Sequence, residues 1–166
     1  MLKMARSTSP PGLRWVEPQN LHFTLRFLGM TKPNELSDIQ AAVARVATNT
    51  GHDFQISLSG ISSFRSRNGA CILWIGVQDG AETLSEIAQK LNLEFKQLGF
   101  APEPKPFHAH LTIARGSISP ALERMIKSLS MVKPEFGKLW ARALILFESE
   151  TRSAGAVYHE RMSAKF

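Results

Sequence analysis

The apolar residues of this chain recur with two periods, which divide it into expected helices and strands. Residues 34–47 carry apolar side chains at helical spacing after a glycine and a proline, which predicts a helix. Residues 54–60 alternate between apolar and polar with period two, as is typical of a half-buried strand. The apolar run 71–77 predicts a second strand, because residues 68–69 (Asn-Gly) form a strong hairpin signal between the two.

The second half of the chain continues this pattern. Residues 79–98 predict a helix with one apolar stripe and a glycine placed to end it. Residues 101–106 (APEPKP) are rich in proline and indicate an extended crossing between two halves of one domain. A short helix is predicted over 119–129, with serine as the N-cap and proline at the first position. Two closing strands are predicted over 139–148 and 156–164.

One five-residue pattern occurs in both halves. Residues 21–25 read LHFTL and residues 109–113 read AHLTI. Successive side chains of a strand point to opposite faces, so each copy is expected to place a histidine and a threonine on one face, about 7 Å apart. The four candidate site residues of the repeated pattern are His22, Thr24, His110 and Thr112.

This repeat also predicts the architecture. Each half contains a motif strand, a helix and then strands, which indicates an α+β, bilobal, pseudo-two-fold fold. Two antiparallel sheets are expected to face a central cleft, with the helices on the outside and one motif from each half. At 166 residues the chain is expected to form a single domain over 1–166.

The composition excludes some classes of protein and favours others. Apolar residues make up 43% and charged residues 20%, and no apolar run approaches the roughly 20 residues of a membrane span. The N-terminus carries no stretch of signal-peptide length, so a cytoplasmic protein without a membrane partner is expected. Cys71 lies in an apolar run, where a buried side chain is expected. The net charge of +6 favours anionic partners such as phosphate esters or nucleic acid.

The side chains near the motifs suit one kind of chemistry. An imidazole has its ordinary pKa nearest neutrality, so two histidines supply one base and one acid without a cofactor. Arg26 has the parity of His22 and is expected on the same face. Arg115 has the opposite parity to His110, and reaches that face only if the strand ends or bulges near 114–116. His108 has the parity of His110.

Neither motif contains a carboxylate, so imidazoles, hydroxyls and guanidinium groups together suit a phosphodiester. One histidine would deprotonate the attacking water and the other would protonate the leaving oxygen, while Thr24 and Thr112 donate hydrogen bonds to the non-bridging oxygens. The sequence does not assign the two roles between His22 and His110.

Residues 20–29 (NLHFTLRFLG) and 107–115 (FHAHLTIAR) resemble the paired signatures of the two-histidine phosphoesterases. Within that superfamily the chain is similar to the RNA 2′,3′-cyclic phosphodiesterases, also named 2′-5′ RNA ligases. The similarity extends to residues 14–16 (RWV), the strand around Trp74 and residues 146–149 (LFES), and so covers the chain from about residue 13.

The resemblance implies a bilobal fold with a cleft and a hydrolase that opens RNA 2′,3′-cyclic phosphates to 2′-phosphomonoesters, with reversible 2′-5′ ligation as a further reaction. It implies no cofactor and no metal. The catalytic roles transfer to His22 and His110, and phosphate binding transfers to Thr24, Thr112 and Arg115. His108 falls where the family varies and is a candidate substrate contact.

The start of the chain departs from this pattern. Relatives carry a strand and a helix before the region of Arg14, whereas this chain is expected to begin near the end of that helix. The first strand of the family is therefore expected to be missing, which would expose a sheet edge. A monomer is expected unless that edge pairs with a second chain.

Three other functions remain open at this point. The same chemistry could act on a small nucleotide or on a cyclic phosphate of ADP-ribose. A zinc enzyme would use His22, His108 and His110 as ligands, but would leave both motif threonines unexplained. A non-catalytic RNA-binding module would use the same side chains only to contact phosphates, although closely spaced exposed aromatic residues are not evident in the sequence.

Overall fold

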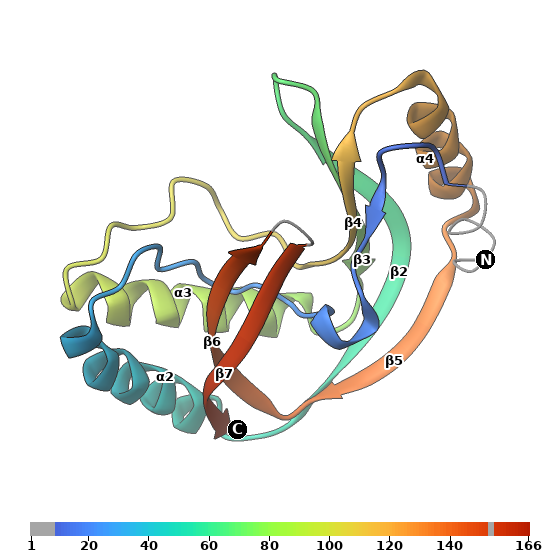
Figure 1. Cartoon of the computed structure of the whole chain (residues 1–166). Helices are drawn as coiled ribbons and strands as arrows, with labels where there is room; N and C mark the ends of the chain where they lie inside the picture. Colours follow the sequence, from blue (N-terminus) through green and yellow to red (C-terminus); the bar gives the residue numbers. More distant parts are fainter. Residues whose placement is uncertain (1–8, 153–154) are drawn as a thin grey trace. The chain divides into compact units, whose positions relative to one another are not determined.

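The computed structural model describes residues 9–152 and 155–166 (Figure 1). The chain forms two compact units, each assembled from three separate segments. Unit 1 comprises Ser57–Asp79, Ala109–Lys138 and the described part of Met1–Phe23. Unit 2 comprises Thr24–Ile56, Gly80–His108 and the described part of Leu139–Phe166. The expected α+β fold with antiparallel sheets is confirmed, although the two units do not coincide with the two halves of the sequence.

The larger sheet has five strands in the order β1-β4-β3-β2-β5. Its strands are β1 (Arg14–Trp15), β2 (Phe54–Arg65), β3 (Ala70–Val77), β4 (His110–Ser117) and β5 (Glu135–Ala141). The neighbours β1 and β4, β4 and β3, and β3 and β2 run antiparallel. The predicted hairpin between β2 and β3 is confirmed, with Gly69 at a positive φ of 80° in its turn.

One face of this sheet forms the core of unit 1. Cys71, Leu73 and Ile75 alternate along β3 on that face, and each is at most 2% exposed. The expected burial of Cys71 is therefore confirmed. Helix α4 (Pro120–Val132) adds Leu122 and Ile126 to the buried set. The helix begins where predicted, because the Ser119 hydroxyl accepts a hydrogen bond from the Leu122 amide at 3.2 Å.

Unit 2 combines two helices with a β-hairpin. Helices α2 (Leu36–Thr50) and α3 (Ala81–Gln97) lie against each other, and α2 also contacts β6 (Ala143–Arg152) and β7 (Gly155–Lys165) (Figure 1). Their buried faces carry the apolar residues that predicted them, Ile39, Val43, Val46, Leu84, Ile87, Leu91 and Phe95. A hydrogen bond from Arg45 to Glu94 joins α2 to α3 and raises the pKa of the guanidinium.

Two strand predictions were wrong. Residues 21–25 belong to no strand and follow a short 3-10 helix, Pro18–Asn20. Alternation predicts an extended backbone, but a strand also needs the free edge of a partner. The predicted strand 139–148 is two strands, because β5 ends at Ala141 in the large sheet and β6 begins at Ala143 in the hairpin with β7.

Candidate active site

Strand β4 carries the second histidine motif and opens with His110. In the register of the sheet, His110 lies opposite Gly76 and Thr112 lies opposite Trp74 on β3. Both motif side chains are half-buried, whereas the intervening Leu111 is buried in the core. The alternation of β4 therefore places the imidazole and the hydroxyl on the face opposite the core, as the motif predicts.

A β-bulge brings Arg115 to this same face. Leu73 pairs with Ala114 and the next β3 residue, Trp74, pairs with Thr112, so Ile113 is the extra residue on β4. Arg115 then lies opposite Ile72, which shares its face of β3 with Trp74. The condition set by the sequence is met, because without this bulge the guanidinium would point into the core.

Strand β1 runs along the bulge and fixes it from the other side. The amide of Val16 donates a hydrogen bond to the carbonyl of Ile113 at 2.9 Å. Gly116 permits the close approach of the chain before β1, since a Cβ atom there would lie 2.7 Å from the Gly12 carbonyl oxygen. The backbone around Arg115 is thus held between two strands, and the position of its Cα does not depend on a loop.

Two aromatic rings surround the imidazole of His110. The Phe64 ring lies 5.0 Å from it, centroid to centroid, with an interplanar angle of 87°, and the Trp74 ring lies at 6.1 Å and 62°. Phe64 is 39% exposed, so its ring adds a solvent-accessible apolar surface beside the histidine. Sequence reasoning missed Phe64 because only the register of β2, β3 and β4 brings it near His110.

His22 is half-buried and belongs to unit 1, as His110 does. Its Nδ1 atom lies 2.7 Å from the carbonyl oxygen of Asn20, the last residue of the 3-10 helix. A carbonyl only accepts hydrogen bonds, so Nδ1 carries the proton and the neutral ring keeps its lone pair on Nε2. The carbonyl at the end of the short helix therefore favours the tautomer of His22 that is protonated on Nδ1.

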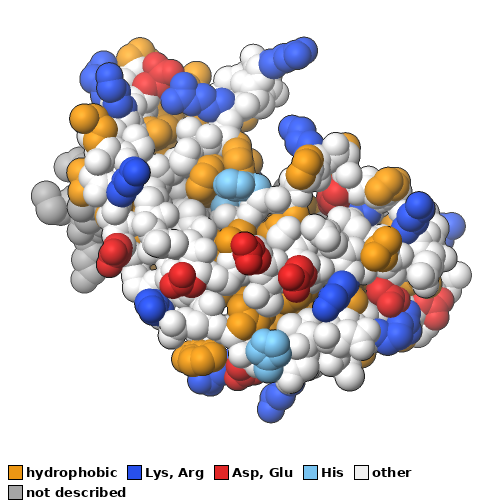
Figure 2. All heavy atoms as spheres, turned by 180° about the vertical axis from the view of Figure 1, so that it is seen from behind, with side chains coloured by type: hydrophobic (Ala, Val, Ile, Leu, Met, Phe, Trp, Pro, Cys, Tyr) orange, Lys and Arg blue, Asp and Glu red, His pale blue; other side chains and the backbone are white. Residues whose placement is uncertain are grey.

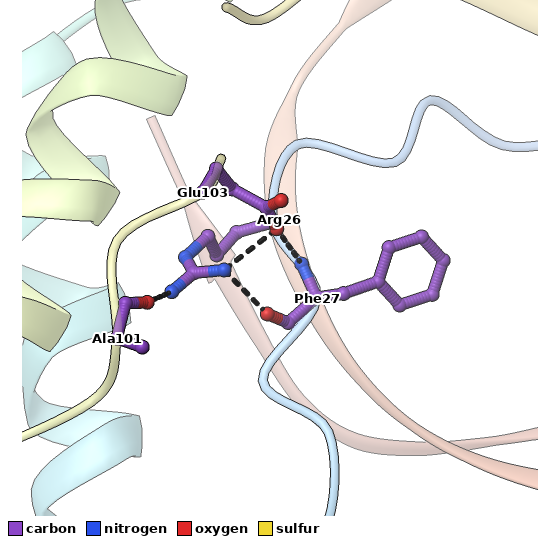
Figure 3. Close-up of polar contacts among 4 residues, drawn as sticks. All are labelled: Arg26, Phe27, Ala101 and Glu103. Carbon is purple, nitrogen blue, oxygen red and sulfur yellow. Dashed lines mark hydrogen bonds and ion pairs between the residues drawn. The ribbon is translucent and has the colours of Figure 1, made fainter. Parts of the chain in front are cut away.

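Thr24 and Arg26 follow in unit 2, where the Arg26 side chain is held by an ion pair and by two carbonyl oxygens. The Arg26 side chain is 7% exposed and donates to the Glu103 carboxylate at 2.6 Å, to the carbonyl of Phe27 at 2.7 Å and to the carbonyl of Ala101 (Figure 3). The Arg26 guanidinium is therefore bound by acceptors within unit 2. It ties the motif segment to the proline-rich crossing, while Thr24 is half-buried.

His108 lies outside the strand on which it was expected. Strand β4 begins at His110, and His108 is an exposed residue of unit 2. Within residues 9–152 and 155–166, no group of three or more His, Cys, Asp and Glu side chains is arranged to hold a metal ion. No helix in this part of the chain is long and apolar enough to cross a membrane.

The basic residues do not gather in one place on the face drawn in Figure 2. Lysine and arginine side chains lie among acidic and apolar ones there. On this face, the basic side chains that contribute to the net charge of +6 do not form a single patch.

Comparisons of the sequence place the chain among known proteins. The family model of the 2'-5' RNA ligase superfamily matches residues 5–151. The RNA 2',3'-cyclic phosphodiesterase of Archaeoglobus fulgidus is 32% identical over 150 residues, which are 90% of this chain and 81% of that protein. The RNA 2',3'-cyclic phosphodiesterase of Methanothermobacter thermautotrophicus is 31% identical over 148 residues, 88% of this chain and 78% of that protein.

Two solved structures share the fold of this chain. The crystal structure of a Thermus thermophilus protein, TT0787, matches with a TM-score of 0.78 at 25% identity, covering 99% of this chain and 88% of that one. Escherichia coli LigT complexed with 3'-AMP matches with a TM-score of 0.77 at 19% identity, covering 99% and 87% of the two chains.

Proposed function

The chain belongs to the 2'-5' RNA ligase superfamily, and on this basis we propose that it hydrolyses 2′,3′-cyclic phosphates at RNA ends to 2′-phosphomonoesters. The observation that carries the proposal is the shared sheet face of His110, Thr112 and Arg115, which combines a proton carrier, a hydroxyl donor and a permanent cation. His22, with its tautomer fixed, belongs to the same unit.

In the proposed reaction, water attacks the phosphorus of the cyclic diester and the bond between phosphorus and O3′ breaks. One imidazole takes a proton from the water, and the other donates a proton to O3′. The products are a 2′-phosphomonoester and a free 3′ hydroxyl, so atoms and charge balance without a cofactor. The same steps with an RNA 5′ hydroxyl as the attacking group in place of water would give the 2′-5′ ligation.

The tautomer of His22 supports its assignment as the base. The Asn20 carbonyl holds the proton on Nδ1, so Nε2 of the neutral ring is an acceptor and accepts the proton of the water. His110 is then the acid. Its ring contacts the rings of Phe64 and Trp74, and these contacts restrict the orientation of the imidazole.

The remaining residues stabilise the charge that develops on phosphorus. Arg115 offers a planar fork of donors to two phosphate oxygens, and Thr112 donates from the same face. We assign the same role to Thr24 from the repeated motif. A guanidinium and two imidazoles supply the positive charge and both proton transfers, so we propose that the reaction requires no metal ion.

The test is incubation of metal-stripped protein, in chelator, with a short RNA that ends in a 2′,3′-cyclic phosphate, with separation of the 2′- and 3′-phosphate products. We expect 2′-phosphate only. His22→Ala and His110→Ala should each lower kcat about 10²- to 10⁴-fold, since each removes one proton transfer. His52→Ala is the matched control, because His52 is exposed and lies outside both motifs.

The outcomes separate the alternatives. A loss in chelator that is restored by zinc would contradict the metal-independent reaction. RNA binding without turnover by the wild-type protein would favour the non-catalytic module. In the pH profile of kcat/KM, we expect His22→Ala to remove the acidic limb and His110→Ala the basic limb. The reverse pattern would exchange their roles.

A further inference from the structure

A second arginine lies directly opposite Arg115 on the neighbouring strand, β1. The register of β1 and β4 pairs Arg14 with Arg115, and both side chains are exposed. Paired residues of an antiparallel sheet share a face, with Cβ atoms about 4.5–5.5 Å apart. Like charges in this position repel and destabilise the sheet, so the arrangement needs a reason.

Several other arginines of the chain form ion pairs with carboxylates. Arg26 is paired with Glu103, Arg45 with Glu94 and Arg65 with Glu123, at 2.6–2.9 Å. Within the part of the chain that the structure describes, neither Arg14 nor Arg115 has such a partner or a side-chain hydrogen bond. Two neighbouring phosphates, one at each guanidinium group, would relieve the repulsion and use both forks of donors.

The position of Arg14 indicates which anion it meets. Arg115 lies opposite Ile72, whereas Thr112 lies opposite Trp74, two residues further along β3. At about 3.3 Å per residue, the backbone positions of Arg115 and Thr112 are therefore about 7 Å apart along the strand. Strand β1 lies on the side of β4 away from β3, so Arg14 is farther still from His110. It is thus placed beyond the group that His110 and Thr112 serve, on the same face.

We propose that Arg14 binds the RNA backbone phosphate adjacent to the reacting cyclic phosphate, which Arg115 binds, and so favours RNA chains over cyclic mononucleotides. This inference deepens the proposed function and rests on it. A cyclic mononucleotide has no second phosphate and cannot use Arg14. The sequence motifs do not include this role, because only the register of β1 on β4 brings Arg14 to the site.

The experiment compares kcat/KM on two substrates, a trinucleotide RNA ending in a 2′,3′-cyclic phosphate and the cyclic mononucleotide with the same base. Loss of one charged hydrogen-bonding group predicts that Arg14→Gln lowers kcat/KM on the RNA about 10- to 100-fold. The loss on the RNA should exceed that on the mononucleotide at least tenfold. The control is Arg67→Gln, an equal change of charge at an exposed residue in the turn between β2 and β3.

A binding measurement makes the result independent of turnover. We would follow the affinity for the trinucleotide with a 2′-phosphate end against salt concentration. A plot of log association constant against log salt concentration has a negative slope. The magnitude of this slope should decrease by about 0.7 in Arg14→Gln, the change expected for loss of one phosphate contact with a single strand. Arg14→Lys keeps the charge and should retain most of the slope.

Each outcome decides between the two proposals. Equal losses on both substrates, or no loss on the RNA, would overturn the role of Arg14 and leave the proposed function intact. If the wild-type protein turned over neither substrate, the proposed function would fail, while a smaller salt slope in Arg14→Gln would still support the phosphate contact. An unchanged slope would overturn the contact in either case.

Discussion

The ion pair between Arg26 and Glu103 predicts a measurable loss of stability when it is broken. The Arg26 side chain is 7% exposed and that of Glu103 is 32% exposed, with Nη1 and Oε1 2.6 Å apart. Removal of one partner of a fully buried pair costs about 3–5 kcal/mol, because the other charge stays buried without compensation. Two carbonyl oxygens still accept from Arg26 in Glu103→Ala, so we expect a smaller loss, about 2–3 kcal/mol.

For a chain of this size, each kcal/mol lowers the Tm by about 2–4 °C, so Glu103→Ala should lower it by about 4–12 °C. The assay is thermal unfolding followed by circular dichroism. The control is Glu123→Ala, which removes the carboxylate from an ion pair with Arg65 whose side chains are 49% and 51% exposed. An exposed pair contributes only about 0–1 kcal/mol.

A local measurement locates the effect. The Phe27 amide donates to the same Glu103 oxygen at 3.3 Å, so its hydrogen exchange should accelerate in Glu103→Ala. Equal shifts of Tm in Glu103→Ala and Glu123→Ala would refute the reasoning, since burial of the guanidinium would then have no energetic consequence.

Two further predictions concern the sheet that carries the site. Phe64→Ala should lower kcat up to about tenfold with little change in Tm, because the half-exposed ring mainly orients His110; an unchanged kcat would exclude that role. Gly116→Ala should lower the free energy of unfolding by about 1–3 kcal/mol in urea titrations, since its Cβ would lie 2.7 Å from the Gly12 carbonyl oxygen. Its neighbour Ser117 is exposed, and Ser117→Ala should be near neutral.

The helices could be predicted from the sequence because their signals are local. Helices α2 and α3 were predicted by an apolar stripe at helical spacing, and both bury that stripe. The Ser119-Pro120 start of α4 was predicted by capping chemistry, and the observed cap is the expected hydrogen bond. These features depend on residues within a few positions of one another.

Strand pairing and remote contacts were less predictable. The alternation over 21–25 gave no information on a partner strand, and the change of sheet at Arg142 has no local signal. The ion pair of Arg26 could not be predicted, because its partner Glu103 lies in the proline-rich crossing, far along the chain. For the site itself, parity alone placed His110 and Thr112 together, whereas the face of Arg115 depended on the bulge.

Because of the bulge at Ile113, the face of β4 that carries the Arg115 guanidinium is determined by the number of residues between Thr112 and Arg115, rather than by their identity. Ile113 and Ala114 are adjacent in the chain and both buried, which a regular strand with one buried face would not allow. The extra residue reverses the alternation of β4, so every side chain after it points to the face opposite to the one that a regular strand would give. A strand with one residue fewer and no bulge would return the guanidinium to the same face, whereas the present spacing without a bulge would not. A search for related active sites should therefore accept both the present spacing with a bulge and a spacing one residue shorter without a bulge. It should also allow changes in the residues between the threonine and the arginine.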